Sequence, residues 1–388
     1  MPAPQPQDYL TLYTQYASEL TMASPDYHLF VGLSSIGSVL NNKVFFPAGV
    51  SPICCNVWFI LLGESRIDFK STACKIAVDL LRTLGRQTKT RYIYPEEFSY
   101  EAMVKSLARD PAGTWFADEF NTFISNLNRK YNDGAKSLLS TLYQYRGEYE
   151  RTLQKNIYKI MDPAPSIWCV TSYDWFINNL EKADISGGFI FRFLIIPSTR
   201  KGKVIPLQPA PDPIKRTALL NKLYEFSKIK GAGYMTPPAK QLHDDWFHKM
   251  LMKAGSGPFA PFAQSLQGYL IKFSMLLQVN EDMTVKIKPG AMRGAIGLIN
   301  WLYAKMEAIQ SEEIVFTPQE KDVLTVKKTI RKHSSQQPTR AELSRLTHLS
   351  KWHLDRAIET LIDRHQLQIV VLKQKGKRDI TTYKLIGE

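Results

Sequence analysis

The first forty residues carry apolar side chains at the spacing of a helix. Tyr9, Tyr13 and Tyr16 recur three or four positions apart and would lie on one helical face. This pattern predicts helical structure over residues 9–40, within an N-terminal helical segment of residues 1–45.

After that segment, short apolar runs alternate with amphipathic stretches. The runs predicted as strands are 43–46, 56–62, 91–94, 114–117, 167–171 and 189–196. The stretches predicted as helices are 71–85, 96–109, 134–145 and 173–181. Strands that alternate with helices predict a parallel sheet covered on both faces, so we expect an α/β fold with its core in residues 46–200.

The pattern changes after this core. Residues 197–213 are rich in Pro and Lys, and proline can neither continue a helix nor donate to a sheet, so they predict a linker. From 214 to about 311 the apolar spacing is helical again, with one small hairpin expected around 285–287. We interpret residues 201–315 as a linker and a helical subdomain.

The last part of the chain, residues 316–388, has a pattern of its own. It predicts a helix over 317–332, a short helix whose Thr339 and Glu342 have capping-box spacing, and a third helix over 351–364. Two strands follow, at 367–372 and 381–385, joined by a basic loop. This order resembles a winged helix-turn-helix, in which the third helix enters the major groove and the wing touches phosphates.

Charge strengthens that interpretation. The 388-residue chain (44.3 kDa) has 50 Lys and Arg against 36 Asp and Glu, a net charge of +14, and residues 316–388 hold +7 of it. A surplus of this size favours a polyanionic partner, with DNA as the first candidate. The 44% hydrophobic content is that of a globular protein and excludes a disordered or fibrous chain.

Neither a membrane nor an oxidising compartment is indicated. No apolar run is long enough to cross a bilayer, and the N-terminal residues lack the pattern of a signal peptide. The four cysteines, Cys54, Cys55, Cys74 and Cys169, lie in apolar surroundings without metal-binding spacing. We expect buried, reduced thiols in a cytoplasmic protein.

The strongest chemical signal is LLGESRIDFKST, residues 61–72. A buried strand, a loop and a helix that opens at Lys-Ser-Thr predict a phosphate-binding loop, with backbone N–H groups and the helix dipole facing the anion. Lys70 would reach the β- and γ-phosphates of ATP, and Ser71 would ligate Mg²⁺. The match to GxxxxGK[ST] is imperfect, because six residues separate Gly63 from Lys70 and Phe69 precedes the lysine, so a structural turn is the alternative. The candidate nucleotide-binding residues are Gly63, Glu64, Ser65, Lys70, Ser71 and Thr72.

A second signal follows at a spacing that suits the first. The apolar run 114–117 ends in Asp118 and Glu119. In an ATPase, Asp118 would hold Mg²⁺ and Glu119 would polarise the attacking water. The alternative is that these acids merely favour the start of the next helix.

Three further positions fit the same chemistry. The run 167–171 ends in Thr171 and Ser172, which could sense the γ-phosphate or position water, or could cap the following helix. Arg192 is expected inside an apolar strand, where an unpaired guanidinium is costly. It would pair with an acid of its own chain or reach a neighbour's nucleotide as an arginine finger.

A basic, aromatic stretch lies between the acidic and hydroxyl strands. Arg146, Arg151 and Lys155, with interleaved tyrosines, could supply charge and stacking for single-stranded DNA, although a mixed-charge surface hairpin is the alternative. In the C-terminal region the candidate DNA contacts are Lys351, His353 and Arg356 on the third helix and Lys373, Lys375, Lys377 and Arg378 on the wing. Winged helices also serve as protein-binding modules, and the lysine run could be a solvated turn.

Residues of roughly 25–310 resemble a family of helicase-like P-loop ATPases of phages, plasmids and other mobile elements, often encoded with or fused to primase-polymerases. The resemblance rests on Gly63-Glu-Ser, Lys70-Ser-Thr, Ala117-Asp-Glu-Phe, Leu138-Leu-Ser-Thr-Leu-Tyr, Ser186-Gly-Gly-Phe and Arg192-Phe. The family loop often reads GxSGxxRKST, which has this longer spacing; Arg66 stands where that pattern has glycine, and Phe69 where it has arginine. The resemblance implies an oligomeric motor related to superfamily 3 or RecA-like and AAA+ helicases, a hexamer with Arg192 acting in trans.

Two functions are therefore expected. The first is a Mg²⁺- and ATP-dependent DNA helicase of mobile-element replication, which binds single-stranded and duplex DNA and relies on a partner primase or polymerase for priming. The second is a DNA-binding initiator, loader or regulator that uses ATP as an assembly switch. A defence-associated ATPase is a third interpretation.

Overall fold

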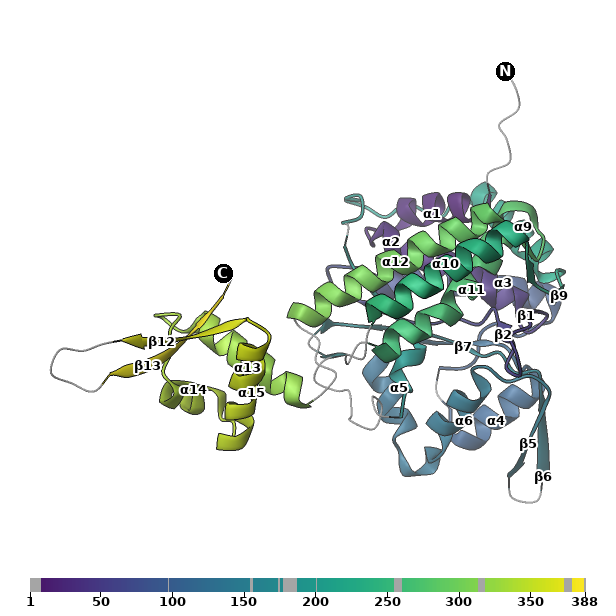
Figure 1. Ribbon diagram of the computed structural model, residues 1–388. Coiled ribbons are helices and arrows are strands. Elements are labelled where there is room, and N and C mark those ends of the chain that lie inside the picture. The colour runs from purple at the N-terminus through teal and green to yellow at the C-terminus, as the bar shows by residue number, and fades with distance from the viewer. Residues whose placement is uncertain are drawn as a thin grey trace. The chain divides into compact units, whose positions relative to one another are not determined.

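The computed structural model describes residues 8–96, 98–153, 156–173, 175–176, 187–199, 201–254, 260–312, 318–372 and 379–386. The chain divides into two compact units, Met1–Met306 and Glu307–Glu388 (Figure 1). Each unit is described by itself below.

The first unit is built on a four-stranded parallel sheet. Its strands are β3 (Trp58–Leu62), β4 (Thr114–Ala117), β7 (Ser166–Thr171) and β8 (Leu194–Pro197), in the order β4-β7-β3-β8. Every residue of β3, β7 and β8 is buried, which explains why these strands read as continuous apolar runs. The α/β fold with a parallel sheet that the sequence predicts is confirmed.

Helices α1 to α6 belong to this unit. They are α1 (Tyr9–Leu20), α2 (Pro25–Leu40), α3 (Lys70–Thr88), α4 (Tyr100–Arg109), α5 (Phe120–Leu127) and α6 (Ala135–Leu142), with a 3₁₀ turn η1 at Lys130–Asn132. The helical pattern of residues 9–40 forms two helices, because Ser24 caps α2 and Pro25 occupies its first turn. Helix α2 is buried along nearly its whole length and packs against α1, α3, α9 and α11.

Four longer helices complete the first unit. They are α9 (Pro213–Ser227), α10 (Pro237–Ala254), α11 (Ala260–Asp282) and α12 (Pro289–Glu312), which agree with the helical pattern after residue 214. The boundary between the two units falls within α12, after Met306. Small sheets join them to the rest: β1 (Val44–Phe46) pairs with β2 (Ile53–Cys54) and β9 (Gly231–Ala232), and β10 (Tyr234–Met235) pairs with β11 (Lys286–Ile287). Figure 1 shows α10, α11 and α12 side by side in green.

Three local expectations were wrong. Residues 91–94 do not form a full strand, since only Ile93 bridges to Thr114. The expected hairpin near 285–287 is instead β11 paired in parallel with β10, a partner about fifty residues earlier. The run 189–196 is not one strand, because the 3₁₀ turn η2 (Ile190–Arg192) precedes β8. In each case the partner strand is distant in sequence, so local apolarity did not define the pairing.

After the end of α12, the described residues of the second unit form three helices and a two-stranded antiparallel sheet. The elements are α13 (Pro318–Lys332), α14 (Arg340–Thr347), α15 (Lys351–Asp363), β12 (Leu367–Leu372) and β13 (Ile380–Leu385). The predicted capping box is present, with Thr339 and Glu342 bonding reciprocally, and Ser350 caps α15 by accepting from the His353 N–H. Its core is formed by apolar side chains from all these elements, including Val326, Leu343, Leu354, Leu361 and Leu367.

Candidate functional site

Most of the predicted nucleotide-site residues line one cavity of about 340 Å³ at the carboxyl ends of β3, β4 and β7. The lining residues come from the loop after β3, the start of α3, the turn after β4 and the end of β7. They are Ser65, Arg66, Phe69, Lys70, Ser71, Thr72, Asp118, Glu119, Asn121, Val170, Thr171, Ser172 and Trp175. Ligands of open α/β sheets bind at this edge, so the cavity is the natural place for a site.

The loop from residue 63 to 69 has a shape that demands special backbone conformations. Arg66 and Phe69 both lie in the left-handed region, with φ of 64° and 48°. Arg66 stands where the family pattern has glycine, and Phe69 where the GxxxxGK[ST] pattern has it. Both positions therefore adopt a backbone conformation that favours glycine, although neither residue is glycine. This conformation costs some free energy in a residue that has a side chain.

Gly63 is required by close contacts. A Cβ atom there would lie 2.3 Å from Asp68 Oδ2 and 2.5 Å from the Tyr27 hydroxyl oxygen. The Asp68 carboxylate closes the loop, because it accepts hydrogen bonds from the Glu64 N–H (2.6 Å) and from the Ser198 hydroxyl (3.1 Å) after β8. These contacts hold the loop against the sheet.

Lys70 is buried at the first position of α3. Its ammonium donates to the carbonyl oxygens of Gly63 (3.0 Å) and Glu64 (2.8 Å), so it lies across the loop. Burial lowers the pKa of Lys70, and the nearby Asp68 and Glu64 carboxylates act in the opposite sense. Phe69, the residue before α3, offers no side-chain cap, which leaves the first-turn N–H groups of α3 suited to an anion.

Asp118 and Glu119 lie across the cavity from Lys70. The Lys75 ammonium, one helical turn after Ser71, contacts Asp118 Oδ2 at 2.6 Å in a partly exposed pair. The other oxygen, Asp118 Oδ1, and Asn121 Oδ1 are both buried, and neither has a hydrogen-bond partner among the residues that the structure describes. Glu119 accepts from the Thr122 hydroxyl at 3.3 Å.

These oxygens fit a Mg²⁺ ion that arrives with a nucleotide. Mg²⁺ prefers hard oxygen ligands and is usually held by one or two carboxylates plus substrate phosphates. Asp118, Asn121 and the Ser71 hydroxyl line the cavity and are ligands of that kind. Within the part of the chain that is described, no three His, Cys, Asp or Glu side chains converge as an all-protein metal cluster.

The hydroxyls after β7 occupy the same cavity. Thr171 is buried at the end of β7, and its carbonyl accepts from the Gly63 N–H at 3.3 Å. The Ser172 hydroxyl accepts from the Trp175 N–H at 3.4 Å, so it also has the capping role that was its alternative.

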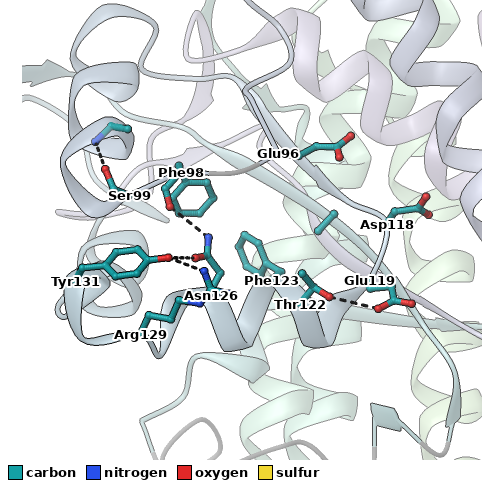
Figure 2. Close-up of a pocket in the computed structure, with 12 residues that line it drawn as sticks. Glu96, Phe98, Ser99, Asp118, Glu119, Thr122, Phe123, Asn126, Arg129 and Tyr131 are labelled. Atoms are coloured by element: carbon teal, nitrogen blue, oxygen red, sulfur yellow. Dashed lines mark hydrogen bonds between the residues drawn. The ribbon is translucent and has the colours of Figure 1, made fainter.

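A second cavity, of about 600 Å³, adjoins the first and shares Asp118 and Glu119 with it (Figure 2). Glu96 adds a third carboxylate, and Phe98, Phe123 and Tyr131 supply aromatic surface. Arg129, the one cation among the described lining residues, lies over the Tyr131 ring, 5.9 Å from the centroid. An acidic and aromatic lining of this kind suits a cationic group better than a phosphate.

Arg192 lies at the opposite edge of the sheet. The Tyr269 hydroxyl donates to the Arg192 carbonyl and to the Trp58 carbonyl. Because Trp58 is the first residue of β3, Arg192 lies near the amino end of that strand, whereas the cavity lies at its carboxyl end. The guanidinium donates to the Gly188 carbonyl (2.7 Å) and lies 6.0 Å from the Tyr143 ring centroid. Burial lowers the pKa of Arg192. Among described residues it has no acidic partner, and it does not reach the cavity of its own chain.

The stretch between the acidic and hydroxyl strands forms an antiparallel hairpin, β5 (Glu148–Leu153) and β6 (Asn156–Met161) (Figure 1). Arg146 precedes it and packs inward, 3.6 Å from the Phe45 ring centroid and 3.7 Å from Asp162. Arg151 is exposed and lies 5.4 Å from the Tyr100 ring centroid. Lys155 lies outside the described residues.

In the second unit, Lys351, His353 and Arg356 are exposed on the first turns of α15. Trp352 lies among these cations and is 61% exposed, and the Arg356 guanidinium is 4.9 Å from its ring centroid. The wing residues Lys373, Lys375, Lys377 and Arg378 lie outside the described residues.

Sequence reasoning missed several residues at these sites. Asn121 could have been found, since it follows Asp118 by three residues at a helix start. No motif assigned a role to Asp68, Lys75 or Trp352, because only the folded structure shows which groups they contact.

Comparison with known proteins adds no family. No protein-family model and no curated protein matches the chain. None of the helices in the described part of the chain combines the length and apolarity that crossing a membrane requires.

Proposed function

We propose that the chain is a Mg²⁺- and ATP-dependent motor that acts on DNA, of the ring-forming helicase type. The observation that carries the proposal is the convergence of the loop after β3, the acids after β4 and the hydroxyls after β7 on one 340 Å³ cavity. These groups are distant in sequence and follow one another along the chain in the order expected of a P-loop ATPase.

Each residue has a role in this proposal. Lys70 turns from the loop carbonyls to the β- and γ-phosphates, while the N-terminus of α3 holds the same anion. Ser71 and Asp118 hold Mg²⁺, which neutralises phosphate charge when bound. Glu119 orients the attacking water, and Thr171 or Ser172 contacts the γ-phosphate. The glycine-type backbone at Arg66 and Phe69 supports a phosphate-binding loop despite the departures from the pattern.

Arg192 supports an oligomer in this proposal. It is remote from the cavity of its own chain, so it can act only on the nucleotide of another copy. The second cavity, with three carboxylates and aromatic rings, offers a cationic side chain of a neighbour an approach to Glu119. A hexameric ring is the form that the family resemblance implies.

DNA is the proposed substrate of the motor. The β5–β6 hairpin carries Arg151 and tyrosines on an exposed projection, and the second unit has the helix and strand order of a winged helix with cations on α15. A primase or polymerase is the proposed partner for priming.

The test is ATP hydrolysis by the purified chain, with and without single-stranded DNA. We expect turnover that DNA stimulates and that Lys70→Ala abolishes, with Lys249→Ala, an exposed lysine on α10, as the matched control. Equal turnover in the Lys70→Ala protein and the wild type would contradict the proposed ATPase activity of this site. Strand displacement on a forked substrate then tests the motor.

A second candidate function is an ATP-switched DNA-binding initiator, loader or regulator. The site is closed by its own side chains, because Lys70 is bound to loop carbonyls and Lys75 is paired with Asp118. ATP would have to displace these contacts in order to bind. Such a change suits an assembly switch. Nucleotide-dependent oligomers without unwinding would favour this function over the motor.

A further inference from the structure

A third cavity, of about 470 Å³, lies where α3 ends and is lined by cations. Its lining residues come from the last turns of α3, from the segment that leads to the Ile93 bridge and from the end of α4. Five of them are cationic: Arg82, Arg86, Lys89, Arg91 and Arg109. Among the described lining residues, none carries a carboxylate.

The cations at the end of α3 form one row. Arg82 and Arg86 lie one turn apart on the same face of the helix, and Lys89 is the residue directly after its last turn. All three are exposed and line the cavity. Residues 82–91 contain no acidic residue at all. Like charges at this spacing repel each other, and a bound anion would relieve that repulsion.

The acids near the cavity are already engaged. Asp110 is paired with Arg109 (3.2 Å) and with Arg91 (3.7 Å). Arg86 donates to the Thr83 hydroxyl at 3.0 Å. Among the residues that the structure describes, no carboxylate pairs with Arg82, Arg86 or Lys89.

The backbone around the cavity is held in place. Lys89 adopts a left-handed conformation at the end of α3, and the Thr90 N–H donates to the Gly85 carbonyl at 3.2 Å. A Cβ at Gly85 would lie 2.7 Å from the Thr90 oxygen, so the turn closes tightly. Cations near a helix C-terminus also interact favourably with the helix dipole, which acts on the cations at the end of α3. Arg91 and Arg109 come from other segments and are paired with Asp110.

We propose that this basic pocket binds the phosphates of a single-stranded DNA backbone. It is separate from the nucleotide cavity, because its lining on α3 begins at Leu81, whereas the lining of the nucleotide cavity ends at Thr72, nine residues or about 14 Å earlier along the helix. A row of exposed cations matches a chain of phosphates, and the net charge of +14 suits a polyanion. The inference rests on the proposed function only in that DNA is the partner.

The test replaces the row on α3. Binding of a fluorescein-labelled oligothymidylate is measured by anisotropy over a range of salt concentrations for the wild type and for Arg82→Glu/Arg86→Glu/Lys89→Glu. The plot of the logarithm of the association constant against the logarithm of the salt concentration has a negative slope. Losing three phosphate contacts should make this slope shallower by about 2 and weaken binding about tenfold or more at low salt. Circular dichroism melting checks that the variant is folded.

The matched control changes charge equally elsewhere. Lys230→Glu/Lys249→Glu/Arg293→Glu replaces three exposed cations of the helical part, and it should leave the slope nearly unchanged. An equal loss in both variants would overturn the proposal, since general charge would then explain it. The proposal would also be overturned if inorganic tripolyphosphate protected the arginines of the pocket from chemical modification and oligothymidylate did not.

The outcomes also separate this inference from the nucleotide site. Nucleotide binding by the wild type is measured in parallel with the DNA titrations. If ATP does not bind but the α3 variant still loses the salt dependence, the proposed motor fails and the basic pocket stands. If ATP binds and the slope does not change, the pocket fails and the motor stands.

Discussion

At the scale of single residues, the loop after β3 depends on how closely its backbone approaches neighbouring side chains. Gly63 lies against the Asp68 carboxylate and the Tyr27 hydroxyl, and that hydroxyl donates to the Leu62 carbonyl at 2.8 Å. Asp68 in turn holds the Glu64 N–H. One added methyl group would therefore disturb three contacts at the entrance of the candidate site.

We predict that Gly63→Ala destabilises the first unit by about 1–3 kcal/mol and abolishes nucleotide binding, because its Cβ must displace Asp68 and Tyr27. Thermal denaturation and nucleotide titration measure the two effects. Gly297→Ala in α12 is the control, since nothing lies within 4 Å of its Cβ, and it should stabilise the helix by up to about 1 kcal/mol. Undiminished nucleotide affinity in Gly63→Ala would contradict this account of the loop.

At the scale of elements, a buried lysine joins the helical subdomain to the amino edge of the sheet. Lys272 of α11 donates to the carbonyl oxygen (2.7 Å) and the side-chain oxygen (2.8 Å) of Asn56, and the Tyr143 ring centroid is 4.1 Å from its Nζ. Asn56 donates to the Tyr143 and Pro165 carbonyls, which precede β5 and β7. Burial lowers the pKa of Lys272 from 10.5 to about 7.

This shift predicts a pH-dependent stability. Between pH 7 and 10.5 the unfolded chain binds a proton at Lys272 and the folded chain does not, so raising the pH favours folding. Relative to Lys272→Met, the wild type should gain up to about 1.4 kcal/mol per pH unit in this window. Burial also raises the pKa of the neighbouring Cys54 and Cys55 thiols.

Chemical denaturation of both proteins at several pH values checks the prediction. At every pH the variant also leaves the Asn56 oxygens without their donor, which costs about 1–3 kcal/mol. A difference between the two proteins that does not change from pH 7 to pH 9 would show that Lys272 keeps its charge in the folded state.

Helix α15 carries the second prediction at this scale. Trp352 is 61% exposed beside Arg356, and an aromatic ring with a stacked guanidinium is a platform for an unpaired base. Trp352→Ala should leave stability nearly unchanged but weaken single-stranded DNA binding by about 1–3 kcal/mol, measured by anisotropy. Leu346→Ala, another exposed apolar residue of that unit, is the control. Equal weakening in both variants would count against stacking.

At the scale of the whole molecule, the chain has two units that each bury a core of their own. The first is organised around the parallel sheet, and the second around side chains of α13, α14, α15 and the β12–β13 pair. A unit with its own core can in principle fold alone.

We predict that a chain ending at residue 312 keeps a cooperative melting transition and its nucleotide affinity, and loses most of its affinity for duplex DNA. The removed part includes the exposed cations of α15, so the salt dependence of DNA binding should also become shallower. Calorimetry and DNA titrations measure these effects. A truncated chain that no longer melts cooperatively would mean that the first unit depends on the second.

The sequence by itself determined most of the elements and the order of the chemical groups. Apolar runs specified β3, β4 and β7, the Thr339 and Glu342 spacing specified the start of α14, and Lys70 and Asp118 were recognisable from strand ends. These features are local, because backbone hydrogen bonding and capping depend on residues a few positions apart.

Only the tertiary structure decided which distant residues meet. It put Arg192 at the far edge of the sheet, paired β10 with β11, set Lys75 beside Asp118, and brought Arg109 to the row of cations on α3. Such contacts join segments tens of residues apart. They depend on how whole faces pack, and neither apolar periodicity nor motif spacing encodes that packing.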